Sequence, residues 1–277
     1  MGWPDDGGAV RAPVAAGSFY PSSPTRLAAD VDDLLATATT PAASAGRPSD
    51  GADVRGIVAP HAGYVYSGPI AATAYAVASV PGRRPARVVI LGPSHFEPLW
   101  GLAVPSHLAW GTPLGDVAID AEARRLLVEA GVTLDDRAHR SEHSIEVQLP
   151  FVQRCFPGVP VLPVAVGWGD PGRGADLVAK VLTDDTLLVV STDLSHYHDA
   201  ETARALDART AAVVEAQDLA SLRPEDACGV EALLVGIACA RRHGWQIRLL
   251  DLRNSADTAG DPDRVVGYGA FALTTST

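Results

Sequence analysis

Lysine is almost absent from this chain of 277 residues. Lys180 is the single lysine among 22 lysine and arginine residues, and the formal net charge is −11. A protein that follows a phosphate backbone needs a stripe of basic side chains, and this composition offers none. We therefore expect no nucleic-acid partner.

Cysteines are few and long apolar runs are missing. Cys155, Cys228 and Cys239 are an odd number with no CxxC spacing, which argues against a disulfide framework and for a reducing compartment. The first residues, MGWPDDGGAV, lack the basic and apolar regions of a secretory leader, and no apolar run reaches the length of a membrane span. These absences predict a cytoplasmic protein that does not enter a membrane.

The remaining composition is that of a globular protein, with 47% hydrophobic and 20% charged residues. Strand-type and helix-type patterns alternate along the chain, which is typical of a mostly parallel sheet flanked by helices. No repeat or linker divides the chain, so we expect a single α/β domain over residues 1–277. The expected strands are 56–59, 88–91, 161–166, 187–191 and two more within 249–273; the expected helices are 24–38, 68–80, 120–130, 142–155, 172–182, 200–217 and 227–243, with a loop at 39–52.

Three apolar strand-like runs end in a short turn and a histidine. They are RGIVAPH, RVVILGPSH and LLVVSTDLSH, which end at His61, His95 and His196. Because residues beyond the carboxyl ends of parallel strands line one ligand crevice, we expect these imidazoles to meet at one edge of the sheet. Asp193 precedes His196 by three residues and can orient its ring. Such a convergence is typical of a metal site.

The segment HRSEHSIEVQLPF combines acidic and imidazole side chains with an apolar pattern. Ser141 is the expected N-cap of a helix, and Glu142 and Glu146, four residues apart, share one of its faces with His143. Two interpretations remain open: a charged, exposed helix start, or a pocket wall that supplies a general acid or base.

Cys228 directly precedes a strongly helical run, CGVEALLVGIACARRHG. At a helix N-terminus the dipole and the free amides lower the pKa of a thiol and favour the thiolate, which is both a nucleophile and a metal ligand. Cys239 falls within the apolar pattern of the same helix, and we expect it to be inert core.

Several long blocks, in order along most of the chain, resemble the Memo family, including its prokaryotic members called AmmeMemoRadiSam system protein B. The blocks are VRAPVAAGSFYP, IVAPHAGYVYSGPIAATAY, VVILGPSH, TPLG, EHSIEVQLPF, STDLSHY, ACG and VVGYGAFAL. The resemblance implies a fold similar to the class III extradiol dioxygenases, with a metal pocket at one end of the sheet. Those enzymes hold iron(II) with two histidines and a carboxylate.

In the Memo family the corresponding pocket has two histidines and a cysteine, which implies His61, His95 and Cys228 as metal ligands in this chain. His196 takes the acid/base position, with Asp193 beside it. A thiolate in place of a carboxylate makes the site softer, which shifts the metal preference toward iron, zinc or copper. The resemblance implies Fe(II), with copper or zinc as alternatives. Glu231, one helical turn after Cys228, remains an alternative carboxylate ligand.

Two classes of function follow. The first is an iron-dependent oxidoreductase that acts on a small phenolic or other chelating substrate, with Glu142 and His143 as further catalytic residues beside His196 and Asp193. The second is a non-catalytic metal- or partner-binding protein with a vestigial site, which acts in redox or metal handling or beside a radical S-adenosylmethionine protein. Hydrolysis by Cys228 ranks last, because no nucleophile elbow is present.

Four tyrosines lie next to the proposed metal residues or in the matching N-terminal block: Tyr20, Tyr64, Tyr66 and Tyr197. They can wall a pocket for a flat ligand. Core packing and hydrogen bonding would produce the same sequence pattern, so both interpretations stay open.

Overall fold

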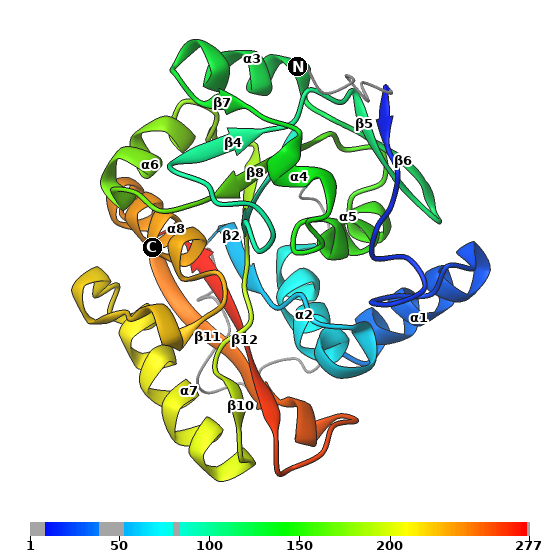
Figure 1. Cartoon of the computed structure of the whole chain (residues 1–277), viewed down its shortest axis with the longest axis vertical. Coiled ribbons are helices and arrows are strands. Elements are labelled where there is room, and N and C mark those ends of the chain that lie inside the picture. Colours follow the sequence, from blue (N-terminus) through cyan, green and yellow to red (C-terminus); the bar gives the residue numbers. More distant parts are fainter. Residues whose placement is uncertain (1–8, 39–52, 80–83, 276–277) are drawn as a thin grey trace.

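A twisted sheet of nine strands runs through the computed structural model, which describes residues 9–38, 53–79 and 84–275 (Figure 1). Four central strands are mutually parallel, in the order β2 (Val54–Ala59), β9 (Thr186–Ser191), β3 (Arg87–Pro93) and β8 (Val161–Val166). β12 (Val265–Thr274) pairs antiparallel with β2, and both β11 (Gln246–Asn254) and β10 (His196–His198) pair antiparallel with β12. At the other edge β4 (Leu102–Val104) is antiparallel to β8 and parallel to β7 (Thr133–Leu134).

Side chains of the central strands alternate between two hydrophobic clusters. Ile57 and Ile90 belong to one cluster, whereas their neighbours Val58 and Leu91 belong to the other. Successive strand residues point to opposite faces, so the two clusters cover the two faces of the sheet. Continuous burial on both faces explains why these strands are nearly uniform runs of aliphatic residues.

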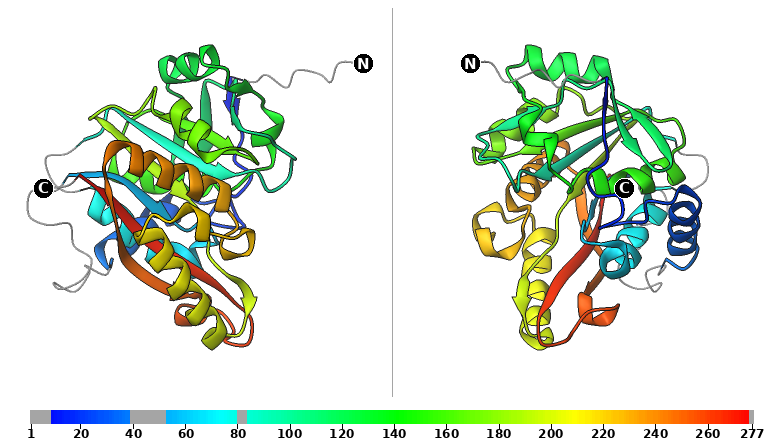
Figure 2. Two further views of the ribbon diagram at one scale, coloured as in Figure 1. Left: turned by 90° about the vertical axis from the view of Figure 1, so that its left-hand side faces the viewer. Right: turned by 45° about the vertical axis from the view of Figure 1, so that its right-hand side comes forward.

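Helices cover both faces. α1 (Pro24–Ala36), α2 (Tyr64–Ala78) and α5 (Leu149–Cys155) pack on one face, and α3 (Ala121–Glu129), α6 (Pro171–Val178), α7 (Ala200–Glu215) and α8 (Val230–His243) on the other. In the right-hand view of Figure 2, α1 and α2 lie to the right of the strands and α7 and α8 to the left. The architecture is an α/β domain with a mixed sheet between helices, as the sequence predicted. Among the described residues, no helix combines the length and hydrophobicity needed to cross a bilayer.

Short elements escaped the sequence analysis. A small sheet of β1 (Val10–Arg11), β5 (Ala109–Thr112) and β6 (Gly115–Ala118) was not predicted, and neither were β4, β7, β10, the one-turn helix α4 (Arg137–Arg140) or the 3₁₀ turns Glu146–Gln148, Leu219–Ser221, Pro224–Asp226 and Ser255–Asp257. Strands of two to four residues carry too few side chains to show a period. The predicted loop 39–52 lies outside the described residues.

The start of α2 was predicted too late. The helix begins at Tyr64 rather than at residue 68, although Pro69 then lies in its second turn. Tyr64 donates its backbone N–H to the Phe19 carbonyl (2.8 Å) and its hydroxyl to the Val147 carbonyl (2.7 Å). These tertiary contacts hold the first turn in place despite the proline.

The helix predicted over 142–155 was also wrong. Only α5 is α-helical there; a 3₁₀ turn at Glu146–Gln148 precedes it, and Ser141 ends α4 instead of capping a new helix. The carboxylate of Glu142 accepts the N–H of Ser144 (2.8 Å), so the local backbone forms a turn. Glu142 and Glu146 therefore do not share a helix face.

Glu146 is fully buried and joins the N-terminal segment to the rest of the molecule. Its carboxylate accepts hydrogen bonds from Arg11 Nη1 (2.6 Å), the backbone N–H groups of Val14 (2.9 Å) and Ala15 (2.7 Å), and the Tyr20 hydroxyl (2.6 Å). These donors satisfy the buried charge, which would otherwise be very costly.

Arg11 extends this connection toward the turn that follows α4. It donates Nε to the carbonyl of His139 (2.8 Å) and Nη2 to the carbonyl of Glu142 (2.7 Å). The guanidinium thus fixes the backbone of the turn that contains Glu142 and His143.

We predict that Glu146→Gln destabilises the protein strongly, because Arg11 would keep its charge in the interior without an anionic partner. Breaking one partner of a buried ion pair costs about 3–5 kcal/mol of unfolding free energy. Urea denaturation measures the change. Glu129→Gln is the matched control: Glu129 pairs with Arg125 on the exposed surface of α3, where such a pair contributes up to about 1 kcal/mol. Equal effects of the two substitutions would contradict this account of the Arg11–Glu146 pair.

Candidate functional site

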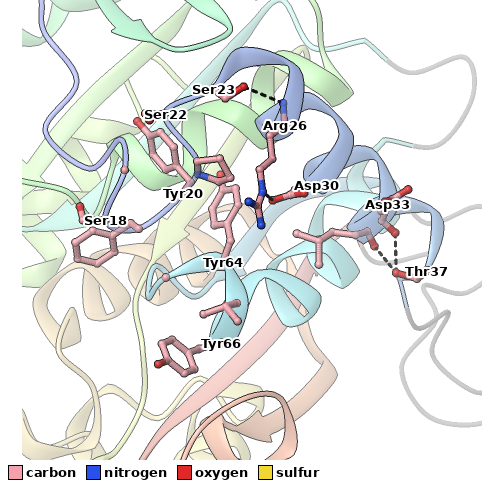
Figure 3. A pocket seen from close by; sticks show the side chains of 16 residues that line it. Ser18, Tyr20, Ser22, Ser23, Arg26, Asp30, Asp33, Thr37, Tyr64 and Tyr66 are labelled. Atoms are coloured by element: carbon pink, nitrogen blue, oxygen red, sulfur yellow. Dashed lines mark hydrogen bonds and ion pairs between the residues drawn. The ribbon is translucent and has the colours of Figure 1, made fainter.

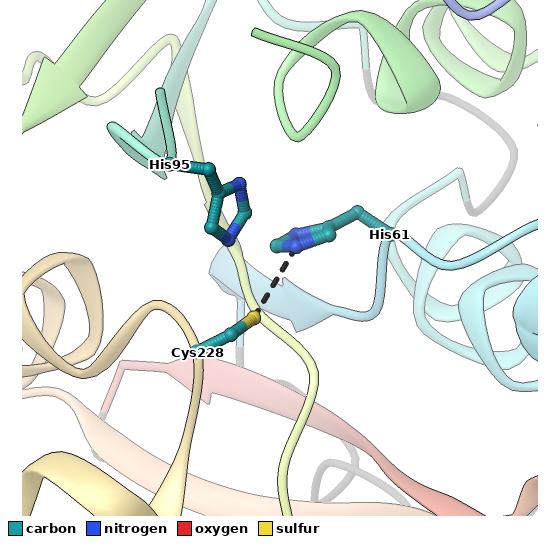
Figure 4. A group of neighbouring side chains, drawn as sticks. All are labelled: His61, His95 and Cys228. Carbon is teal, nitrogen blue, oxygen red and sulfur yellow. Dashed lines mark hydrogen bonds between the residues drawn. The ribbon is translucent and has the colours of Figure 1, made fainter. Parts of the chain in front are cut away.

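His61, His95 and Cys228 meet at the carboxyl edge of the parallel strands. Their ligand-type atoms all lie within 4.8 Å of one another, and Cys228 Sγ is 3.3 Å from His61 Nε2. Figure 4 shows the two rings and the sulfur directed toward a common point from three separate segments. Side chains that are far apart in the sequence are therefore neighbours, as the resemblance implied.

Strand pairing explains this proximity. Ala59 of β2 is in register with Ser191 of β9, and Leu91 of β3 is in register with Val190, so the chain leaves all three strands at the same level. His61 follows β2 after one proline, and its backbone N–H donates to Asp193 Oδ1 (2.8 Å), just beyond β9. The two loops are therefore tied together at the site.

His61 is buried and its ring is oriented by Ser191. The Ser191 hydroxyl donates its single hydrogen to the Ser144 carbonyl (2.7 Å) and accepts from Gln148 Nε2 (2.9 Å). It therefore has no hydrogen left to donate to His61. His61 Nδ1, 3.0 Å away, must then be the donor to Ser191, which leaves the lone pair on Nε2 facing the sulfur. Burial, with the nearby His95 as a second cause, lowers the pKa of His61 to about 3, so its ring is neutral at pH 7.

His95 is oriented by a carboxylate. Its Nδ1 lies 3.0 Å from Glu142 Oε1, and its backbone N–H donates to Oε2 (2.6 Å). Burial alone would raise the pKa of Glu142, but its hydrogen bonds with the side chain and backbone of His95 outweigh burial and hold it at about 2. An ionised carboxylate only accepts, so Nδ1 of His95 carries a hydrogen, and in the neutral ring the lone pair lies on Nε2. Histidines that bind metals in proteins are usually held this way.

Cys228 lies two residues before α8, and Gly229 is the N-cap. A position just before a helix predicts a lowered thiol pKa. That expectation was wrong for the metal-free chain: burial and the charge of Asp193 raise the pKa of Cys228, and the backbone N–H of Asp193, which donates to Sγ (3.3 Å), does not compensate. The thiol is thus protonated at neutral pH and lies beside the free Nε2 of His61.

His143 completes a group of three imidazoles. Its ring stacks on His95 (centroids 5.1 Å apart) and on Phe19 (4.3 Å), and it meets His61 edge-on at 5.6 Å. Burial, followed by the proximity of His61, lowers the pKa of His143 to about 4. The ligand-type atoms of His143 and Glu142 lie within 4.8 Å of those of His95, and both residues belong to a turn and not to a helix.

His196 and Asp193 form a second group with Cys228. Their ligand-type atoms and Cys228 Sγ are within 4.8 Å of one another. The predicted orienting contact is wrong, however: His196 Nδ1 lies 2.7 Å from the Leu194 carbonyl, whereas Asp193 accepts from the backbone of His61. Because a carbonyl only accepts, Nδ1 of His196 is the donor. Burial raises the pKa of Asp193.

Glu231 is absent from the groups of described side chains whose ligand atoms come together. It lines a different cavity, next to Trp100 and Arg173. Geometry therefore favours Cys228 over Glu231 as the third member of the cluster with His61 and His95.

The four tyrosines were open to two interpretations, as walls of a ligand pocket or as packed and hydrogen-bonded core residues. Tyr20, Tyr64 and Tyr66 line one open cavity of about 750 Å³ (Figure 3), but the hydroxyls of Tyr20 and Tyr64 are engaged inside the protein by Glu146 and Val147. Tyr197 is exposed and lies under the guanidinium of Arg264. Packing and hydrogen bonding thus account for Tyr20 and Tyr64.

Ser191, Gln148 and Arg11 were missed by the sequence analysis. Ser191 has the clearest signal, because a hydroxyl at the carboxyl end of the apolar strand LLVVS interrupts a buried run. Gln148 and Arg11 act through contacts with distant segments.

Comparison with known proteins agrees with this geometry. The family described as Memo-like protein matches residues 11–272. The chain is 33% identical to a MEMO1 family protein of Desulfurococcus amylolyticus (94% of this chain, 98% of the relative), 35% identical to MEMO1 family protein MK0963 of Methanopyrus kandleri (95% and 98%) and 36% identical to a MEMO1 family protein of Aquifex aeolicus (94% and 97%). Among solved structures, an uncharacterized protein of Escherichia coli K12 is 15% identical with a TM-score of 0.49, covering 80% of this chain and 100% of that chain, a similarity too low to argue from. The family match over nearly the whole chain and the full-length relatives show that this chain belongs to the Memo family.

Proposed function

We propose that this chain binds one metal ion through His61 Nε2, His95 Nε2 and Cys228 Sγ. The observation that carries the proposal is the state of the two imidazoles. Both Nδ1 atoms are engaged by oxygen acceptors, so in the neutral rings both lone pairs lie on Nε2, and the ligand-type atoms cluster with the sulfur within 4.8 Å. Histidines that only pack or bond within the core have no need of this shared arrangement.

The donor set narrows the choice of metal. Two imidazole nitrogens and one sulfur suit iron, zinc and copper better than magnesium or calcium, which prefer oxygen. We propose Fe(II), the metal that the resemblance implies, with copper and zinc as the competing ions. A bound Fe(II) would supply a centre for dioxygen and for a chelating substrate.

The surrounding side chains have separate tasks in this proposal. Ser191 and Glu142 hold the imidazoles with Nε2 toward the metal position. His143 stacks on His95, and Phe19 stacks on His143, so the two rings hold the imidazole of His95 by packing. His196 lies near Cys228 with its Nδ1 engaged by the Leu194 carbonyl, so in the neutral ring its Nε2 can take a proton from a phenolic hydroxyl.

A second candidate function follows from this position of His196: an oxidoreductase that acts on a small phenolic or chelating substrate, with His196 as the acid/base and Asp193, His143 and Glu142 as supporting groups. The alternative is a non-catalytic protein of redox or metal handling, or a partner of a radical S-adenosylmethionine protein. Metal binding is common to both.

We predict that the purified protein, reconstituted with Fe(II) without oxygen, holds about one iron per chain. His61→Ala, His95→Ala and Cys228→Ser should each weaken binding by more than about tenfold, because each removes one donor atom. Iron content after gel filtration and a competitive chelator titration measure this. His243→Ala and Cys155→Ser are matched controls outside the site and should retain iron. Ligand variants that keep iron as well as the parent would show that the donor set is wrong.

A further prediction concerns Ser191. Ser191→Ala leaves all three donors in place but removes the acceptor of His61 Nδ1–H, so iron affinity should fall by about 10- to 100-fold, the usual cost of losing such an outer partner. Ser22→Ala, on the exposed surface, should have no effect. Unchanged affinity in Ser191→Ala would mean that the hydroxyl does not orient the imidazole.

Catalysis is tested separately by dioxygen uptake with a panel of catechols. The oxidoreductase proposal expects uptake by the iron-loaded protein and a loss of about 10²- to 10⁴-fold in His196→Ala at unchanged iron content. Background uptake with every compound would favour the non-catalytic alternative.

A further inference from the structure

A second cavity opens at the same edge of the sheet, one strand beyond the metal candidate. It has a volume of about 380 Å³ and lies among the first turns of α6 and α8, the end of β8 and the loop before β4. This size falls within the range of small-molecule sites in proteins, roughly 300–1,000 Å³. Nothing in the proposed metal function assigns it a role.

Three charged residues line this cavity: Asp170 is engaged as the N-cap of α6, where it accepts the N–H of Gly172 (2.9 Å), and the other two, of opposite charge, have no partner in the described part of the chain. Arg173, in α6, and Glu231, in α8, make no ion pair or side-chain hydrogen bond with any other residue that the structure describes. The cavity in Figure 3 differs, because its Arg26 is paired with Asp30 (3.7 Å). A half-buried carboxylate without a donor is unfavourable, and burial raises the pKa of Glu231. A cationic ligand group would relieve that cost.

A rigid aromatic surface borders the charges. Trp100, which lines the cavity, is 76% exposed and lies against Trp168, which is 53% exposed; their ring centroids are 5.4 Å apart. The two loops are joined by hydrogen bonds from Gly101 N–H to the Trp168 carbonyl (2.8 Å) and from Trp168 N–H to the Leu99 carbonyl (3.0 Å). These hydrogen bonds fix the backbone of both loops, while the two indole rings remain exposed to solvent. Exposed aromatic rings on a fixed backbone are typical of a binding surface.

The contact between these loops is too close for a side chain at position 167. A Cβ on Gly167 would stand 2.0 Å from the Leu99 carbonyl oxygen. Gly167 therefore allows the two loops to come into contact, and this contact brings Trp100 and Trp168 together.

We propose that this cavity binds a small zwitterion with a flat apolar group, in the manner of an aromatic amino acid. The carboxylate of the ligand pairs with Arg173, its ammonium pairs with Glu231, and its ring packs on Trp100. A simple anion would leave Glu231 unpaired and a simple cation would face Arg173, whereas a zwitterion satisfies both charges.

Isothermal titration calorimetry with three matched probes tests the proposal on the full-length protein. L-phenylalanine carries both charges, 2-phenylethylamine only the ammonium and 3-phenylpropanoate only the carboxylate. We expect L-phenylalanine to bind about tenfold or more tightly than either of the other probes, since each of those lacks one of the two charged contacts.

Two variants assign the contacts. Arg173→Gln should reduce the affinity for L-phenylalanine to that for the amine, and Glu231→Gln should reduce it to that for the carboxylate. Arg248→Gln and Glu225→Gln, which alter exposed charges elsewhere, are the matched controls and should bind like the parent. Iron content is measured in parallel and should be unchanged in every variant, so that a failure of this site and a failure of the metal site are distinguishable. Absence of binding by all three probes, equal binding of a singly charged probe, or unchanged affinity in Arg173→Gln and Glu231→Gln would overturn the proposal.

Discussion

Parallel pairing of β2 and β3 on either side of β9 is the constraint on which the candidate site depends. The registers Ala59–Ser191 and Leu91–Val190 bring the ends of three strands to one level, where the chain leaves the sheet through short loops. His61 and Asp193 follow two of these strands and His95 follows the third. A shift of register would separate them, because each residue of slip moves a strand end by about 3.3 Å.

Hydrogen bonds to neighbouring residues determine which ring nitrogen of each clustered histidine faces the candidate site. Ser191 and Glu142 occupy the Nδ1 atoms of His61 and His95, and so determine where the lone pairs point. Arg11 and Glu146 in turn hold the turn that carries Glu142. The N-terminal segment thus supports the imidazole of His95 through the buried Arg11–Glu146 pair and Glu142. Residues outside the candidate site therefore help to determine its geometry.

Local sequence patterns predicted much of this arrangement, and their failures have a common cause. The aliphatic runs that end at His61 and His95 indicated the sheet and the edge at which the candidate site lies. Strands that are buried on both faces are nearly continuous aliphatic runs, so the sequence shows them directly. The segment after α4 is not the predicted helix, because partners far away in the sequence override the helical spacing of its two glutamates. Glu142 binds His95, and Glu146 binds Arg11 and Tyr20. Cys228 was singled out by its place before a helix and by the family resemblance, but the direction of its pKa shift depended on burial that no local pattern shows.

The positions of the three cysteines have a consequence for oxidative chemistry. Cys228 lies at the edge of the sheet beside His61, whereas Cys239 belongs to the hydrophobic cluster on one face and Cys155 packs against the cluster on the other. A sulfenic acid formed at Cys228 would therefore meet no second thiol of its own chain with which to close a disulfide. Its repair would depend on a thiol arriving from solution, and further oxidation to the irreversible sulfinic state would compete with that encounter.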